Sequence, residues 1–163
     1  MSRLLGKKFA LVSLTLLACF IAFTSNTFAN PSKAKRTDMV REQLKELGYN
    51  PTLDDDGDLL FKASGYTFLI ILDDDDDLFY RIIVPGIDKI DADDVDESMK
   101  KILAVLKVSK ELKSVKICFT EDVLSMTYEG FYDSVDDFNL VLERLINLVS
   151  RCVLKYQSDV ADD

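Results

Sequence analysis

Three strand-like runs joined by short connections constrain the fold of this chain most strongly. The middle run, residues 66–72, is β-branched and aromatic and is apolar at successive positions, which predicts a central strand with neither face freely solvated. Residues 59–63 precede it across the turn Ser64-Gly65. Residues 78–84 follow it, and Pro85-Gly86 should end that strand. Together, the three runs predict an antiparallel meander.

Three other segments have helical periodicity. Residues 37–47 predict a short amphipathic helix, with Thr37 as N-cap and Gly48 as C-cap. Residues 91–112 carry acids in their first turns and lysines later, a polarity that the helix dipole favours. The apolar positions that mark the helical period of this segment are Val95, Met99, Ile102, Leu103 and Leu106.

The third helical segment, residues 134–157, begins at Ser134, which reads as an N-cap followed by an acid three residues later. It carries the longest apolar stripe and should form the main cover of the core. The residues of this stripe are Phe138, Leu142, Leu145, Val149, Cys152 and Tyr156.

Two further strands are predicted between the second and third helices. Residues 115–119 and residues 124–129 alternate apolar and polar side chains, with Thr120-Glu121-Asp122 as a hairpin turn. The element order is then α-β-β-β-α-β-β-α, which lacks the strand–helix alternation of a doubly wound parallel sheet. The predicted fold class is α+β, with an antiparallel sheet of about five strands and three helices.

The first 29 residues show the three zones of a secretory signal peptide. Basic residues precede an apolar run at 9–23, and small residues lead to a cleavage site between Ala29 and Asn30. The run is shorter than the ~20 residues that span a bilayer. A second interpretation applies to the same segment, because Leu16-Leu17-Ala18-Cys19 resembles a lipobox in which Cys19 would be lipidated.

Cleavage would leave a flexible leader at 30–36, one domain at 37–157 and an acidic tail at 158–163. The expected location is periplasmic or secreted, with membrane contact only through the signal peptide or a lipid anchor. The formal net charge of −9 argues against a nucleic-acid partner. The chain has no histidine, which excludes catalytic chemistry that needs an imidazole. No catalytic residue and no cofactor are predicted, and the protein is expected not to be an enzyme.

Two aspartate runs are candidates for binding a cation. The first, residues 54–58, resembles the opening of an EF-hand loop, but Leu59 stands where that loop needs Gly and Gly65 stands where it needs Glu. The second, residues 73–77, lies in a strand connection and could be only a solvated loop tip. The hairpin between the two runs should bring both to one end of the sheet. The candidate ligands are Asp54, Asp56, Asp58, Asp73, Asp75 and Asp77.

Cys118 and Cys152 are the two cysteines that remain after cleavage at Ala29. An oxidising compartment would favour a disulfide between such a pair. However, Cys152 lies on the core stripe, whereas Cys118 alternates away from its apolar neighbours. A disulfide needs Cα atoms within ~7 Å, so both thiols are predicted to be free.

Several short motifs stand at the ends of the predicted elements. They are Leu47-Gly48-Tyr49, Asp56-Gly57-Asp58, Leu60-Phe61-Lys62, Phe79-Tyr80-Arg81-Ile82, Glu129-Gly130-Phe131 and Ser134-Val135-Asp136-Asp137-Phe138. With these motifs the chain resembles the YbjN-like family, whose fold is similar to that of type III secretion chaperones. The resemblance covers about residues 37–157 and implies a compact, non-enzymatic domain that binds or regulates another protein, often as a dimer. It transfers no catalytic residue.

The sequence therefore predicts an exported, non-enzymatic protein-interaction or regulatory domain of YbjN type, with a protein partner of unknown identity and with a homodimer as one expected assembly. Two alternatives stay open. One is a periplasmic divalent-cation-binding protein that uses the aspartate-rich loops. The other is an inner- or outer-membrane lipoprotein anchored through Cys19.

Overall fold

The computed structural model of the protein describes residues 31–112 and 114–162. Within these residues the chain forms three helices and six strands in the order α, four strands, α, two strands, α, which confirms the predicted α+β class. Their bounds are α2 (Lys33–Glu46), β1 (Thr52–Leu53), β2 (Leu59–Ala63), β3 (Tyr66–Leu72), β4 (Phe79–Lys89), α3 (Val95–Glu111), β5 (Val115–Thr120), β6 (Val123–Phe131) and α4 (Val135–Asp162).

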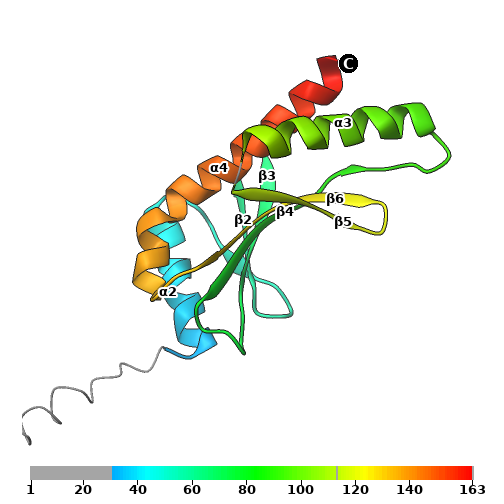
Figure 1. Ribbon diagram of the computed structural model, residues 1–163. Coiled ribbons are helices and arrows are strands. Elements are labelled where there is room, and N and C mark those ends of the chain that lie inside the picture. Colours follow the sequence, from blue (N-terminus) through cyan, green and yellow to red (C-terminus); the bar gives the residue numbers. More distant parts are fainter. Residues whose placement is uncertain (1–30, 113, 163) are drawn as a thin grey trace, which may run out of the picture. The chain divides into compact units, whose positions relative to one another are not determined.

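One antiparallel sheet contains all six strands, in the order β1-β2-β3-β4-β6-β5 (Figure 1). The predicted meander is confirmed, because β2 pairs with β3 and β3 pairs with β4. The β5–β6 hairpin is also confirmed, and it joins the meander through pairing of β6 with β4. The sixth strand, β1, pairs two residues with β2 and is too short to produce an alternating pattern.

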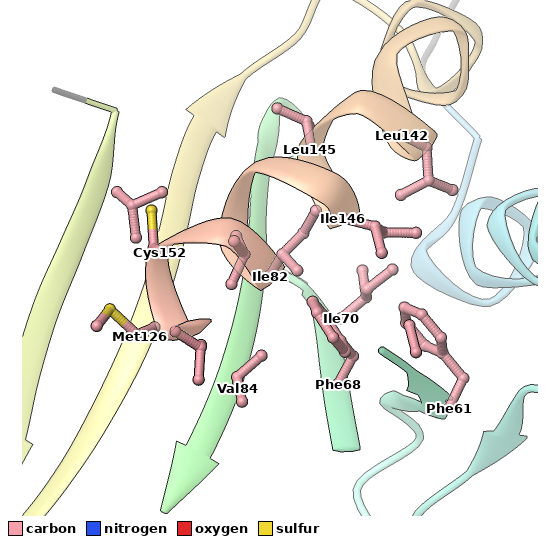
Figure 2. Packing of buried hydrophobic residues seen from close by; sticks show 14 of the residues in the cluster. Phe61, Phe68, Ile70, Ile82, Val84, Met126, Leu142, Leu145, Ile146 and Cys152 are labelled. Atoms are coloured by element: carbon pink, nitrogen blue, oxygen red, sulfur yellow. The ribbon is translucent and has the colours of Figure 1, made fainter. Parts of the chain in front are cut away.

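The core lies on the face of the sheet that α2 and α4 cover. The predicted stripe of α4 is confirmed, since all six of its residues are buried. Figure 2 shows side chains of α4, such as Ile146 and Cys152, gathered with those of the underlying strands. The inward strand residues alternate with outward ones, as the pleat requires. They include Phe61, Phe68, Ile70, Ile82, Val84 and Met126.

The opposite face of β3 is partly covered, which agrees with the prediction of a central strand with neither face freely solvated. Its apolar residues Leu69 and Ile71 are only half-buried, and the three described helices lie on the other side of the sheet (Figure 1). Neighbours on the same face provide the partial cover, because Leu69 pairs across the strands with Ile83 and Ile71 pairs with Arg81. Apolar side chains on both faces of a strand therefore do not require a second helical layer here.

The start of α2 differs from the prediction, which placed it at residue 37. Residues 33–36, expected to belong to a flexible leader, form the first turn of α2. Thr37, expected as the N-cap, is buried inside the helix, and Ser32 occupies the N-cap position. Burial of Arg36 against the loop after β3 explains the earlier start. Gly48 follows the helix with φ +86°, in agreement with its predicted C-cap role.

Two other boundaries also extend beyond the prediction. The strand β4 continues through Pro85-Gly86 to Lys89, with a register shift between Val84 and Asp88 that accommodates the proline. The helix α4 continues through residues 158–162, which were expected to form a tail. At its start, Ser134 is confirmed as the N-cap, because its Oγ accepts from the Asp137 N–H at 3.2 Å.

The predicted signal peptide, its cleavage site at Ala29 and Asn30, and Cys19 all lie outside the described residues. In the described part of the chain, no helix combines the length and the apolar character needed to cross a membrane.

Candidate functional site

The apolar stripe that identifies α3 from the sequence faces solvent. We call this surface the α3 stripe; its five side chains are between 38% and 67% exposed. The opposite side of the helix, which faces the domain, buries Ser98, Ala104 and Val108. A small side chain such as Ala104 lets α3 approach α4 closely, whereas the bulky side chains of the other face stay exposed. The stripe consists of Val95, Met99, Ile102, Leu103 and Leu106.

The orientation of α3 is fixed at its start by hydrogen bonds. The Asp94 side chain caps the helix by accepting from the Glu97 N–H at 3.1 Å. Ser98 Oγ donates to Asp91 O at 2.6 Å. These contacts hold the first turn of the helix, so Val95 projects outward rather than into the core.

A polar cluster between α3, β4 and α4 fixes the middle of α3. Lys101 Nζ donates to Asp88 Oδ1 at 2.9 Å and to Lys89 O at 2.8 Å. On the other side of the same carboxylate, the Tyr156 hydroxyl donates to Asp88 Oδ2 at 2.9 Å. One aspartate on β4 therefore links both helices and sets the face that α3 presents to solvent.

The protonation behaviour of this cluster follows from its geometry. Burial opposes ionisation of Asp88, but hydrogen bonds from Lys101, the Lys89 N–H and Tyr156 outweigh it and lower the pKa of Asp88. The hydrogen bond to Asp88 raises the pKa of Lys101. Both shifts favour the charged forms, so the pair is ionised at neutral pH.

Charged residues border the α3 stripe. A hollow of about 430 Å³ lies beside Leu103 and Leu106 and is lined by Lys100, Lys107 and Lys110. The N-terminal end of the helix is acidic instead, with Asp96 and Glu97 in its first turn. An exposed apolar stripe with a charged border has the chemistry of a helix that docks on another protein.

The two aspartate runs lie at the same end of the sheet, as the hairpin argument predicts. Lys33 Nζ lies 3.7 Å from Asp58 Oδ1 of the first run and 3.4 Å from Asp74 Oδ2 of the second. Arg36 adds a second cation, with Nη2 at 3.0 Å from Asp77 Oδ1. Basic side chains of α2 therefore neutralise part of this acidic corner.

Several aspartates of the corner are used in turns. Asp54 Oδ1 accepts from the N–H groups of Asp56 and Asp58 at 3.0 and 2.9 Å, and Asp73 Oδ1 accepts from the Asp75 N–H at 2.7 Å. Across residues 31–112 and 114–162, no three metal-ligating side chains are grouped to hold an ion. The divalent-cation site at Asp54, Asp56, Asp58, Asp73, Asp75 and Asp77 stays a prediction for titration.

The uncovered sheet face has a shallow hollow of about 320 Å³ over β3, β4, β6 and β5. At its rim, Arg81 Nε lies 2.9 Å from Glu129 Oε1, and Lys116 Nζ also contacts this carboxylate. The hydrogen bond from Lys116, reinforced by Arg81, lowers the pKa of Glu129. Because its basic and acidic side chains are already paired, this hollow presents no free charge pattern that indicates a ligand.

The structure confirms that both cysteines are free. Cys118 lines the hollow on the uncovered face, whereas Cys152 is fully buried in the core on the opposite side. Burial raises the pKa of the Cys152 thiol to about 11. Sequence reasoning identified the two faces correctly from strand alternation and from the helical stripe.

No family model and no curated protein matches this sequence. Among solved structures, the chain is similar to an uncharacterized protein from Methanothermobacter thermautotrophicus, with a TM-score of 0.57 and 17% identity over 78% of this chain and 97% of that one. It is also similar to YbjN from E. coli, described as "a putative transcription regulator", with a TM-score of 0.54 and 12% identity over 74% of this chain and 90% of that one. At these identities the likeness concerns the fold, which is YbjN-like.

Proposed function

We propose that this protein is an exported, non-enzymatic protein-interaction domain of YbjN type and that the α3 stripe is its binding surface. The observation that carries the proposal is the exposure of five large apolar side chains on one helix face. Exposed apolar area of this kind is stabilised when a partner covers it. A polar network that fixes α3 keeps the stripe outward and ready to bind.

The composition supports binding rather than catalysis. The chain contains no histidine, and several of its carboxylates are engaged in turns or in ion pairs. If this protein has a regulatory role, we expect it to act through protein contacts, because a net charge of −9 repels a phosphate backbone.

Export is supported by the charged, apolar and small-residue zones of the first 29 residues. We expect the mature chain in the periplasm or secreted, beginning at Asn30. Mass spectrometry of the protein recovered from the cell envelope and medium tests this. An acylated N-terminal Cys19 would replace cleavage at Ala29 with the lipoprotein alternative, and an unprocessed N-terminus would contradict export.

Binding is tested with a variant of the stripe and a matched control. Leu103→Asp with Leu106→Asp places two charges on the α3 stripe, whereas Leu140→Asp changes an 84% exposed leucine on α4. Proteins captured by wild type and by Leu140→Asp, but not by the stripe variant, are purified and titrated against each form. Equal affinities of the captured protein for all three forms would overturn the proposed surface.

A further inference from the structure

We infer that a hollow between α2 and the two aspartate runs binds a linear aliphatic polyamine, a ligand whose ammonium groups are separated by methylene chains. The hollow has a volume of about 330 Å³, which lies within the ~300–1,000 Å³ typical of small-molecule pockets. It is separate from the α3 stripe, because Figure 1 shows α2 beside the start of α4 and α3 beside its later turns. Binding in the hollow is therefore independent of the proposed function.

Carboxylates from three segments line the hollow. Asp38 lies on α2, Asp56 lies in the turn between β1 and β2, and Asp74 lies in the loop after β3. Lys33 is the one basic side chain among the described residues that line it, so the walls hold an excess of two negative charges. Such walls attract a cation, and they favour one that carries more than one positive charge.

These carboxylates are spread over the walls rather than gathered at one point. Within residues 31–112 and 114–162, no three metal-ligating side chains are placed to share an ion. A single calcium ion needs about six to eight oxygen ligands around it, which this arrangement does not supply. A polyamine holds its charges apart along a chain, so that each ammonium group can meet a different carboxylate.

A buried hydroxyl on the same wall gives an independent indication of a ligand. Thr37 lines the hollow and is only 4% exposed, yet its Oγ1 has no hydrogen-bond partner among the residues that the structure describes. Leaving a buried polar atom without a partner costs free energy. An ammonium group bound beside Thr37 would donate to Oγ1 and supply the missing partner.

The hollow already accommodates an ammonium group on a methylene stem, that of Lys33. Its Nζ lies 3.4 Å from Asp74 Oδ2 and 3.7 Å from Asp58 Oδ1. Both distances exceed the ~2.7–2.9 Å of a charge-assisted hydrogen bond, so Lys33 satisfies these carboxylates only in part. Ala34 and Leu53 line the same hollow and provide apolar surface for the methylene chain of a ligand.

Titration calorimetry of the protein as the cell processes it, with putrescine and with spermidine, tests the site. Both polyamines should bind at physiological ionic strength. Butylamine, which has the chain and the single ammonium group of a lysine side chain, should bind about tenfold more weakly than putrescine. Calcium chloride at the same ionic strength should give no saturable heat. Equal affinity for butylamine would overturn the polyamine assignment, and no saturable binding of either polyamine would overturn the site.

Neighbouring aspartates provide matched controls. Asp74→Asn should raise the dissociation constant for spermidine about fivefold, whereas Asp75→Asn removes the same charge just outside the hollow and should change it by less than about twofold. Asp56→Asn, with Asp55→Asn as its control, should behave in the same way. Equal effects within either pair would indicate general attraction to the acidic corner and would overturn the site.

Thr37→Val separates binding from folding. The substitution removes a hydroxyl that has no partner in the free protein, so the melting temperature should be unchanged or higher. The dissociation constant for spermidine should nevertheless rise about threefold, because the ligand loses an acceptor. An unchanged dissociation constant would overturn the placement of an ammonium group at Thr37 Oγ1.

Discussion

Arg36 in the first turn of α2 lies 3.0 Å from Asp77 Oδ1 in the loop after β3, and only 1% of its surface is exposed. Its Nη1 and Nη2 atoms donate to Asp77 O and Asp73 O at 2.6 and 2.7 Å. Burial raises the pKa of the neighbouring Tyr80 hydroxyl, and Arg36 opposes part of that rise. One buried cation thus joins α2 to the acidic corner.

Arg36→Met should lower the free energy of unfolding by about 3 kcal/mol, because it leaves two loop carbonyls without donors and an aspartate without its ion-pair partner. Denaturant titration followed by circular dichroism measures the change. Arg41→Met is the control, since Arg41 pairs with Asp38 at the surface of the same helix. It should cost less than about 1 kcal/mol. Equal effects of the two substitutions would contradict a special role for Arg36.

Calcium should stabilise the protein no more than sodium chloride at the same ionic strength. The physical reason is that carboxylate oxygens of the acidic corner already accept hydrogen bonds from backbone N–H groups in the turns and form ion pairs with Lys33 and Arg36. Both salts should raise the melting temperature by screening the remaining repulsion. Calorimetric melting in matched solutions measures this. A larger shift with calcium would instead support the predicted divalent-cation site.

Elements in which apolar residues recur at a regular spacing could be predicted from the sequence. Strands β2 and β3 match residues 59–63 and 66–72, and the stripe of α4 is buried as expected. Alternation and helical periodicity report which residues share a face, and for α4 a long stripe leaves little choice about which face turns inward. The fold class was therefore predictable.

Which face of α3 turns toward the domain could not be predicted in the same way. Its larger apolar stripe is exposed and its narrower face, with Ala104 and Val108, is buried. Periodicity alone does not state whether a face packs on its own domain or on another molecule. The deciding contact joins Lys101 to Asp88, two residues that are 13 positions apart in the chain, and it has no local sequence signature.

Arg36 was also missed, because a basic residue in a polar segment is ordinarily solvent-exposed. A clue was present in the five consecutive aspartates of residues 73–77, which need compensating cations when they are held in a tight connection. The end of strand β4 was also predicted too early. Pro85 lies at a bulge, where a proline does not end the strand.

The two free thiols should differ strongly in reactivity. Cys118 lines the hollow on the uncovered face, whereas burial excludes reagent from Cys152 and raises its pKa to about 11. Iodoacetamide at pH 8 should therefore label Cys118 in the folded protein and Cys152 only after denaturation. Peptide mass spectrometry without reduction measures both sites. A disulfide-linked peptide containing both cysteines would contradict the structure.

The Asp88 cluster should make stability depend on pH in the acid range. Because the pKa of Asp88 is lower in the folded state than in the unfolded chain, its contribution is fully present above its ordinary value of about 3.9. The contribution is lost as the pH falls through the folded-state pKa. Asp88→Asn should therefore cost about 1 to 2 kcal/mol at neutral pH and less in acid.

The matched control for this cluster is Asp122→Asn, because Asp122 pairs with Lys89 at 3.8 Å on the surface. Melting temperatures of both variants and of wild type are measured from neutral pH down to about pH 3. The difference between wild type and Asp88→Asn should shrink toward acid, while that for Asp122→Asn stays small throughout. A constant difference would show that Asp88 stabilises the domain by packing rather than by its charge. Since Asp88 also orients α3 through Lys101, Asp88→Asn should in addition weaken binding at the α3 stripe at neutral pH.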